Sequence, residues 1–256
     1  MGAEQARDGL LIDVPALMRA RAAGGDAKER EARAQSLDIA EIAALAPRIA
    51  TFAILCNNAY QRSQPLTLPH SWKMVVREGQ GKGLAYAVYE RQQEGRPVEA
   101  VVSYRGTDDA YDWLHNFGIA KIQTDEAEEV FKTISGEYRG KGITKISATG
   151  HSLGGGLALH ASFKFAGVAA TAFNCAPFEP PGDAAYRSNP RICVWEENEI
   201  LQFVRDDKLP GKWDNTRLVK VNFAHGLPVA QHKMEPMARS LVIAAAPYDA
   251  ELRALL

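Results

Sequence analysis

The chain has few cysteines, almost no net charge and no long uninterrupted apolar run. Only three of its 256 residues are cysteines, Cys56, Cys175 and Cys193, and their spacing matches no metal site. We therefore expect buried, reduced thiols rather than a disulfide framework. A formal net charge of −1 without a basic cluster gives no electrostatic footprint for nucleic acid, so we predict no nucleic-acid partner.

Signals for membrane insertion and secretion are also lacking. The longest apolar stretch, residues 39–56, contains Glu41, Pro47 and Arg48, so we do not expect it to span a membrane. The first residues are charged and lack the apolar core and small-residue cleavage site of a signal peptide. We expect a protein made in the cytoplasm, for which any export uses a route without a cleaved signal. The oligomeric state stays open.

What is present favours one catalytic domain. The composition, 46% hydrophobic and 24% charged, is typical of a globular chain with a large core. We predict a loosely ordered segment over residues 1–35 and a single domain over residues 36–256. Early in that domain we expect a helix over residues 39–46, a second helix that begins at Pro47, and a meander of strands over residues 72–77, 84–89 and 98–104.

The most informative segment is Gly-His-Ser-Leu-Gly at residues 150–154. It lies between a β-prone run, residues 143–149, and a small-residue helix that begins near Leu153. A serine on such a strand-to-helix turn is held clear of the backbone, provided that Gly150 and Gly154 leave room at the bend. The free N–H groups at the start of the helix also point at any negative charge near Ser152. The pattern predicts a nucleophile elbow.

The surroundings of this turn support that interpretation. Apolar residues near helical spacing follow an acidic run, residues 125–129, and predict a helix up to about Tyr138. Beyond the turn, an apolar stripe runs along the next helix, and residues 168–173 have the pattern of a buried strand. The resulting series of helix, strand, turn, helix and strand predicts an α/β fold.

A second motif lies at the end of the strand before these elements, in the sequence Tyr-Arg-Gly-Thr at residues 104–107. An acyl-transfer enzyme needs two donors for the oxyanion, one after the nucleophile and one on a loop after an earlier strand. The N–H groups of Leu153 and Thr107 occupy those two places in the sequence. We predict that they form the oxyanion hole.

Together the two motifs resemble the class 3 lipase family of α/β-hydrolases. The family has a similar (F/Y)-R-G-(S/T) turn and commonly the elbow G-H-S-L-G-G, and the resemblance covers about residues 58–232. It implies a mostly parallel central sheet with an antiparallel N-terminal meander, helices on both faces, and esterase or lipase activity. A lipase without a signal peptide also resembles the small lipase effectors of bacterial contact-dependent secretion systems. Fungal members of the family carry a short amphipathic lid after the oxyanion turn. The equivalent residues here, 108–114, include three carboxylates and could cover the site, and residues 178–190 are a further candidate cover.

The catalytic histidine is expected late in the chain, because the usual order on this fold is serine, acid, histidine. We favour His232, which precedes a predicted helix over residues 234–246, as in class 3 lipases, and keep His225 as the alternative. The other four histidines have simpler interpretations as satisfied or solvated side chains. They are His70, His115, His151 and His160.

The catalytic acid is expected on the loop after the strand predicted over residues 191–195. Glu199 fits the family pattern best, although most members use aspartate. Asp206 and Asp207 are the alternatives, favoured by residue type and disfavoured by their distance from the strand. We interpret Glu196 and Glu197 as solvated charges.

The resulting hypothesis is a serine ester hydrolase that acts on lipid or phospholipid acyl esters through an acyl-enzyme on Ser152. This chemistry requires no metal or organic cofactor. The partners would be a lipid or small-molecule substrate and, transiently, a membrane surface. A soluble carboxylesterase or thioesterase would use the same residues, and a non-catalytic binding protein with a hydrolase fold is the alternative from another class.

Overall fold

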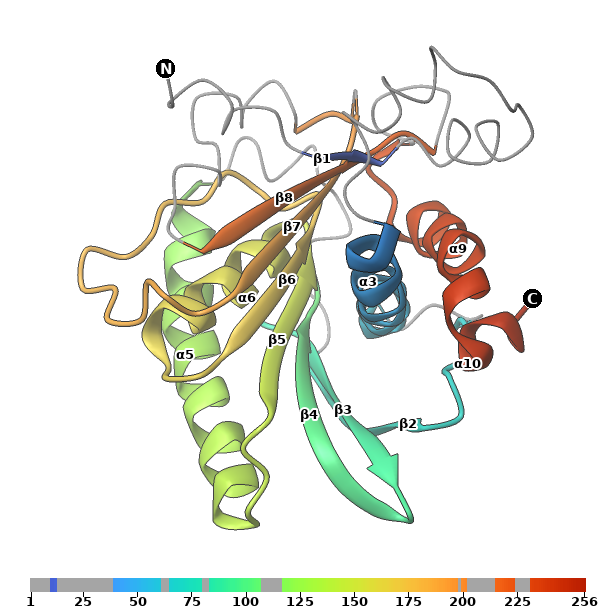
Figure 1. The fold of residues 1–256 in the computed structure, drawn as a ribbon. Helices are drawn as coiled ribbons and strands as arrows, with labels where there is room; N and C mark the ends of the chain where they lie inside the picture. Colours follow the sequence, from blue (N-terminus) through green and yellow to red (C-terminus); the bar gives the residue numbers. More distant parts are fainter. Residues whose placement is uncertain are drawn as a thin grey trace.

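The computed structural model describes residues 10–12, 39–60, 65–79, 83–106, 117–197, 199–201, 215–223 and 231–256. Its strands form one eight-stranded sheet in the order β1-β8-β7-β6-β5-β4-β3-β2 (Figure 1). The strands are β1 (Leu10–Ile12), β2 (Trp72–Glu78), β3 (Tyr86–Gln93), β4 (Arg96–Tyr104), β5 (Ile146–His151), β6 (Ala169–Phe173), β7 (Arg191–Glu196) and β8 (Thr216–Val221). The helices are α3 (Ile39–Ala59), α5 (Phe117–Gly140), α6 (Leu153–Lys164), α9 (Met234–Ala245) and α10 (Ala250–Arg253), with a short 3₁₀ helix, η2 (Ala246–Tyr248).

The sheet is antiparallel at one end and parallel elsewhere. β2, β3 and β4 form an antiparallel meander, and every pair from β4 to β8, together with β8 and β1, is parallel. Glu94 and Gly95, both at positive φ, close a tight turn between β3 and β4, so the strands extend further than predicted. This arrangement confirms the predicted α/β-hydrolase fold. β1 lies within the segment predicted to be loosely ordered, and it pairs with β8.

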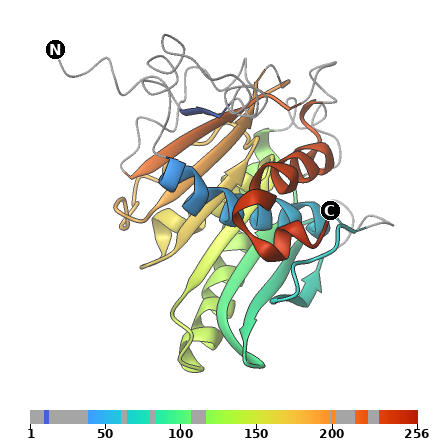
Figure 2. The same ribbon diagram turned by 45° about the vertical axis from the view of Figure 1, so that its right-hand side comes forward.

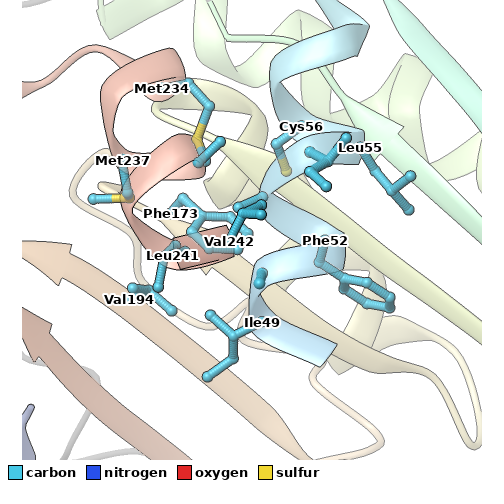
Figure 3. Packing of buried hydrophobic residues seen from close by; sticks show 14 of the residues in the cluster. Ile49, Phe52, Leu55, Cys56, Phe173, Val194, Met234, Met237, Leu241 and Val242 are labelled. Carbon is cyan, nitrogen blue, oxygen red and sulfur yellow. The ribbon is translucent and has the colours of Figure 1, made fainter. Parts of the chain in front are cut away.

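Helices cover both faces of the sheet (Figures 1 and 2). α5 and α6 pack on one face, where Phe131 and Leu157 meet Val102 and Ala148. α3 and α9 pack on the other face, and Figure 3 shows Ile49 and Cys56 of α3 and Leu241 of α9 in one apolar cluster with sheet residues Phe173 and Val194. Neighbouring residues of one strand therefore serve opposite cores: Val101 faces α3, while Ala100 and Val102 face α5 and α6.

Two helices differ from the prediction. Residues 39–59 form one helix that continues through Pro47, not two. Proline removes a single backbone hydrogen bond, whereas the helix buries Ile49, Phe52 and Leu55 against the sheet and α9. We attribute the continuity of the helix to this packing, which outweighs the effect of the proline.

α5 begins at Phe117, well before the acidic run at residues 125–129. Most of those charges lie on its exposed face and mark that face rather than its start.

The three cysteines are buried and free, as predicted. Burial raises the pKa of the Cys56 thiol to about 12, although Thr149 Oγ1 lies 3.1 Å from its sulfur. This thiol stays protonated and is no nucleophile. None of the described helices is long and apolar enough to cross a membrane.

Candidate active site

Ser152 occupies the sharp turn between β5 and α6. Its backbone has φ 57° and ψ −125°, a conformation that residues with a side chain rarely adopt. A Cβ atom on Gly150 would lie 2.1 Å from the carbonyl oxygen of Gly154, and one on Gly154 would lie 2.2 Å from that of Tyr104. Both positions therefore require glycine, for the reason that the sequence motif suggested.

The backbone around Ser152 is held by hydrogen bonds to β6 and the segment after it. The Ser152 N–H donates to the Phe173 carbonyl at 3.0 Å, and the Ala176 N–H donates to the Ser152 carbonyl at 3.0 Å. Leu153 is the first residue of α6, so its N–H has no acceptor within the helix and lies beside the nucleophile. This arrangement suits one donor of an oxyanion hole.

The end of β4 lies against the nucleophile. A Cβ on Gly106 would be 2.9 Å from Ser152 Cβ and 2.6 Å from the His151 carbonyl oxygen, so only glycine permits this approach. The Arg105 N–H donates to the Ala85 carbonyl at 2.9 Å, which fixes the strand end. Thr107, the predicted second oxyanion donor, lies outside the described residues, as does the predicted lid at residues 108–114.

Glu199 and His232 form a buried hydrogen-bonded pair. His232 Nδ1 lies 2.6 Å from Glu199 Oε2. The same carboxylate oxygen accepts the Leu201 N–H at 3.0 Å, and Glu199 has no exposed surface. A carboxylate in this position fixes the histidine ring and favours the tautomer with hydrogen on Nδ1, leaving Nε2 as the proton acceptor.

This pair lies next to the elbow. The ring of His151, the residue before Ser152, has its centroid 4.7 Å from that of His232, and its Nε2 atom lies 2.7 Å from the His232 carbonyl oxygen. The predicted nucleophile, acid and base thus gather at one edge of the sheet, where the parallel strands end. The alternatives His225, Asp206 and Asp207 lie outside the described residues.

One polar residue that the sequence analysis missed supports the segments around the pair. Asn174, at φ 38° just after β6, donates from Nδ2 to the Gln231 carbonyl at 3.4 Å and accepts the Glu196 N–H at 2.8 Å. Its signal in the sequence was an asparagine, which tolerates positive φ, directly after a strand.

The interpretation of Glu196 as a solvated charge was wrong. Its side chain is buried, and its Oε1 accepts the Phe223 N–H at 2.6 Å. β7 runs one residue further than predicted and includes Glu196. The hydrogen bond of its side chain therefore links the end of β7 to the residues that follow β8. Glu197 is partly exposed, with Oε2 3.4 Å from Asn222 Nδ2.

Two of the remaining histidines lie away from this site. The side chain of His70 is exposed and lies 3.4 Å from Glu251. His160, on α6, has its Nε2 atom 2.8 Å from Glu128 Oε2 on α5. His115 lies outside the described residues. His151 is satisfied, as expected, but at the centre of the site.

Much of the segment at residues 178–190 is unsuited to cover the site. Buried Arg191 donates to the carbonyls of Tyr186 at 2.6 Å and of Ser162, near the end of α6, at 3.1 Å. Its guanidinium also lies 3.4 Å from the centre of the Phe163 ring. These contacts hold the second half of the segment beside the last turn of α6, opposite the end that carries Ser152. The reason is topological, because a parallel crossover must return to the start of the next strand.

Comparisons with known proteins identify the family and the fold. A family model described as "Phospholipase-like: Tle-like phospholipase domain" matches residues 51–219, a span that includes Ser152 and Glu199 but ends before His232. No curated protein gives a significant match.

One solved structure shares the fold at low identity, and two others are similar at lower scores. Lipase II from Rhizopus niveus superposes with a TM-score of 0.52 at 14% identity, over 64% of this chain and 76% of that chain. The Rhizomucor miehei lipase propeptide complex gives a TM-score of 0.49 at 13% identity, over 62% of this chain and 61% of the lipase. Brefeldin A esterase, titled a bacterial homologue of human hormone sensitive lipase, gives 0.41 at 12% identity, over 82% of this chain and 87% of that one.

Proposed function

Since this chain belongs to the Tle-like phospholipase domain family, we propose that it is a serine hydrolase that cleaves acyl esters of lipids or phospholipids with Ser152, His232 and Glu199. The observation that carries the proposal is the buried hydrogen bond of 2.6 Å between Glu199 and His232, beside a serine on a nucleophile elbow. Carboxylate, imidazole and serine in this arrangement are the parts of an acyl-transfer triad.

In the first half of the reaction, Ser152 Oγ attacks the acyl carbonyl while His232 Nε2 accepts the hydroxyl proton. The buried Glu199 carboxylate balances the charge of the resulting imidazolium. The N–H groups of Leu153 and Thr107 stabilise the oxyanion. His232 then returns the proton to the departing alcohol, and the acyl group remains on Ser152 as an ester.

In the second half, water replaces the alcohol. His232 takes a proton from the water as the water oxygen attacks the acyl carbonyl. The tetrahedral intermediate then collapses, the bond between the acyl carbon and Ser152 Oγ breaks, and His232 returns its proton to Oγ, which releases the fatty acid and regenerates the hydroxyl. Apart from the substrate and water, both halves use only side-chain and backbone groups of the chain.

Family membership supports lipid esters as the substrate class, with phospholipids as the first choice. Such esters are presented at a membrane surface, so transient contact with that surface is part of the proposal. A soluble carboxylesterase or thioesterase would use the same chemistry and differ only in the substrate that is turned over.

The test is hydrolysis of a panel of esters that differ in acyl chain length and head group, with Ser152→Ala as the control. We expect Ser152-dependent release of fatty acid, fastest from phospholipid. Turnover confined to water-soluble esters or thioesters would favour the alternative substrates. A wild-type protein that a fluorophosphonate probe does not label at Ser152, and that hydrolyses nothing, would be a binding protein.

A further inference from the structure

Three segments that are distant in the sequence meet at the side chain of His151. The hydroxyl of Tyr60, at the end of α3, lies 2.6 Å from His151 Nδ1. On the opposite side of the ring, His151 Nε2 lies 2.7 Å from the carbonyl oxygen of His232. All three residues are buried. The side chain that precedes the nucleophile therefore links α3 to the segment that carries the proposed base.

The donor and the acceptor in each of the two hydrogen bonds of His151 follow from the chemistry of the partner groups. A carbonyl oxygen only accepts, so His151 Nε2–H is the donor to His232. In a neutral imidazole the other nitrogen then carries a lone pair, and the Tyr60 hydroxyl donates to Nδ1. Turning the ring over about its Cβ–Cγ bond would break both hydrogen bonds, because the carbons Cδ2 and Cε1 would take the places of Nδ1 and Nε2. Tyr60 thus holds His151 in the one tautomer that can donate to His232.

We propose that His151 is a positioning residue for His232, and that Tyr60 in turn orients His151; this inference rests on the proposed function. Glu199 holds the imidazole of His232 through Nδ1. His151 holds the backbone of the same residue through its carbonyl. Two anchors, one on the ring and one on the main chain, fix both the place and the rotation of the base.

The position of His151 directly before Ser152 lets this contact couple the nucleophile to the base. His151 is joined to Ser152 by a peptide bond, and its ring packs against that of His232 at 4.7 Å between centroids. A short path through one residue therefore connects the nucleophile to the base. If the end of β5 shifts, both reacting groups shift together and their separation is preserved. A purely structural histidine would contribute to stability without this effect on the chemical step.

Two amide substitutions separate these roles, because each retains one half of the imidazole. Glutamine places its amide near Nε2 and can still donate to the His232 carbonyl, whereas asparagine reaches only the Nδ1 position near Tyr60. We expect His151→Gln to keep kcat within about tenfold of wild type, the worth of one neutral hydrogen bond. We expect His151→Asn to lower kcat about a hundredfold, as for a base displaced by about 1 Å, with KM unchanged. Tyr60→Phe should lower kcat by up to about tenfold.

The control is His160, which lies on α6 and pairs with Glu128. His160→Asn and His160→Gln should both leave kcat at the wild-type value. Active-site titration with a fluorophosphonate corrects each rate for the fraction of folded, reactive enzyme. Proton NMR of the resonance shared by His232 Nδ1 and Glu199 gives a second readout, which we expect to be retained in His151→Gln and broadened in His151→Asn.

Equal corrected kcat values for His151→Asn and His151→Gln would overturn the inference. So would a His151→Asn loss that disappears after correction for folded enzyme, since the residue would then be only structural. In both cases wild-type turnover that depends on Ser152 would leave the proposed function standing. A wild-type protein without such turnover would overturn the proposed function and the inference together.

Discussion

Replacing Glu199 by glutamine removes a charge from a side chain that solvent does not reach. One carboxylate oxygen, Oε2, accepts hydrogen bonds from both His232 Nδ1–H and the Leu201 N–H. The amide oxygen of glutamine can take that place and keep both hydrogen bonds. The substitution then tests the charge of the acid with little change in shape.

The magnitude follows from the distance between the two charges. With about 4 Å between the centres of the carboxylate and the imidazolium, and an effective dielectric constant of about 20, the attraction is about 4 kcal/mol. Losing it in the transition state lowers kcat about a thousandfold. If the amide turns and donates to Nδ1, it imposes the wrong tautomer, and the loss becomes about ten-thousandfold. We expect a loss of kcat between about a thousandfold and about ten-thousandfold.

The assay is kcat on a soluble chromogenic ester, corrected by titration of Ser152 with a fluorophosphonate. The matched control is Glu196→Gln, the same change in another buried carboxylate at the end of β7. It should reduce stability but keep kcat within about tenfold of wild type, because Glu196 bonds the Phe223 N–H and not the base. A Glu199→Gln enzyme within tenfold of wild type, or a larger loss in Asp206→Asn or Asp207→Asn, would refute the assignment.

Three further predictions concern the nucleophile, the base and the oxyanion turn. Ser152→Ala and His232→Ala should each lower kcat about a millionfold with an unchanged circular dichroism spectrum, and the double variant should lose no more; an inactive His225→Ala beside an active His232→Ala would transfer the role. Gly106→Ala should lower kcat at least a hundredfold, because the new methyl group would overlap Ser152; a rate near wild type would show that the turn can move away. Thr107→Gly keeps the backbone N–H and removes the hydroxyl; if that hydroxyl fixes the loop that carries the donor, kcat should fall by up to about a hundredfold to a thousandfold with little change in KM, and an unaltered rate would argue against this role of the hydroxyl.

Local patterns were sufficient for the elements that build the site. β6, β7 and α9 begin and end within one residue of their predicted limits, and α6 begins at Leu153, as predicted. Each is a short segment whose apolar spacing or glycine content reflects its own geometry. Chain order narrowed the candidates, the resemblance to class 3 lipases favoured Glu199 and His232, and the structure places Glu199 Oε2 2.6 Å from His232 Nδ1. Family membership confirms the predicted class, an ester hydrolase of the lipase and phospholipase kind.

Local sequence patterns do not predict contacts between segments that are distant in the sequence. Tyr60 and His151 are 91 residues apart in the sequence, and neither has a neighbour that marks the contact. Glu196 stands in a run of charges, and only the sheet shows that it is buried. Pro47 has a strong local preference for a helix start, which packing overrides. In each case tertiary structure determines the environment of the residue.

The conformation of Ser152 has a consequence for the balance between stability and activity. A non-glycine residue at φ 57° and ψ −125° carries about 1–3 kcal/mol of strain. Glycine would remove that strain and return only about 0.4–1 kcal/mol through the greater freedom of the unfolded chain. An inactive Ser152→Gly protein should therefore melt above the wild type, whereas Ser152→Ala retains the strain. The fold gives up part of its own stability to hold one hydroxyl group where it can react.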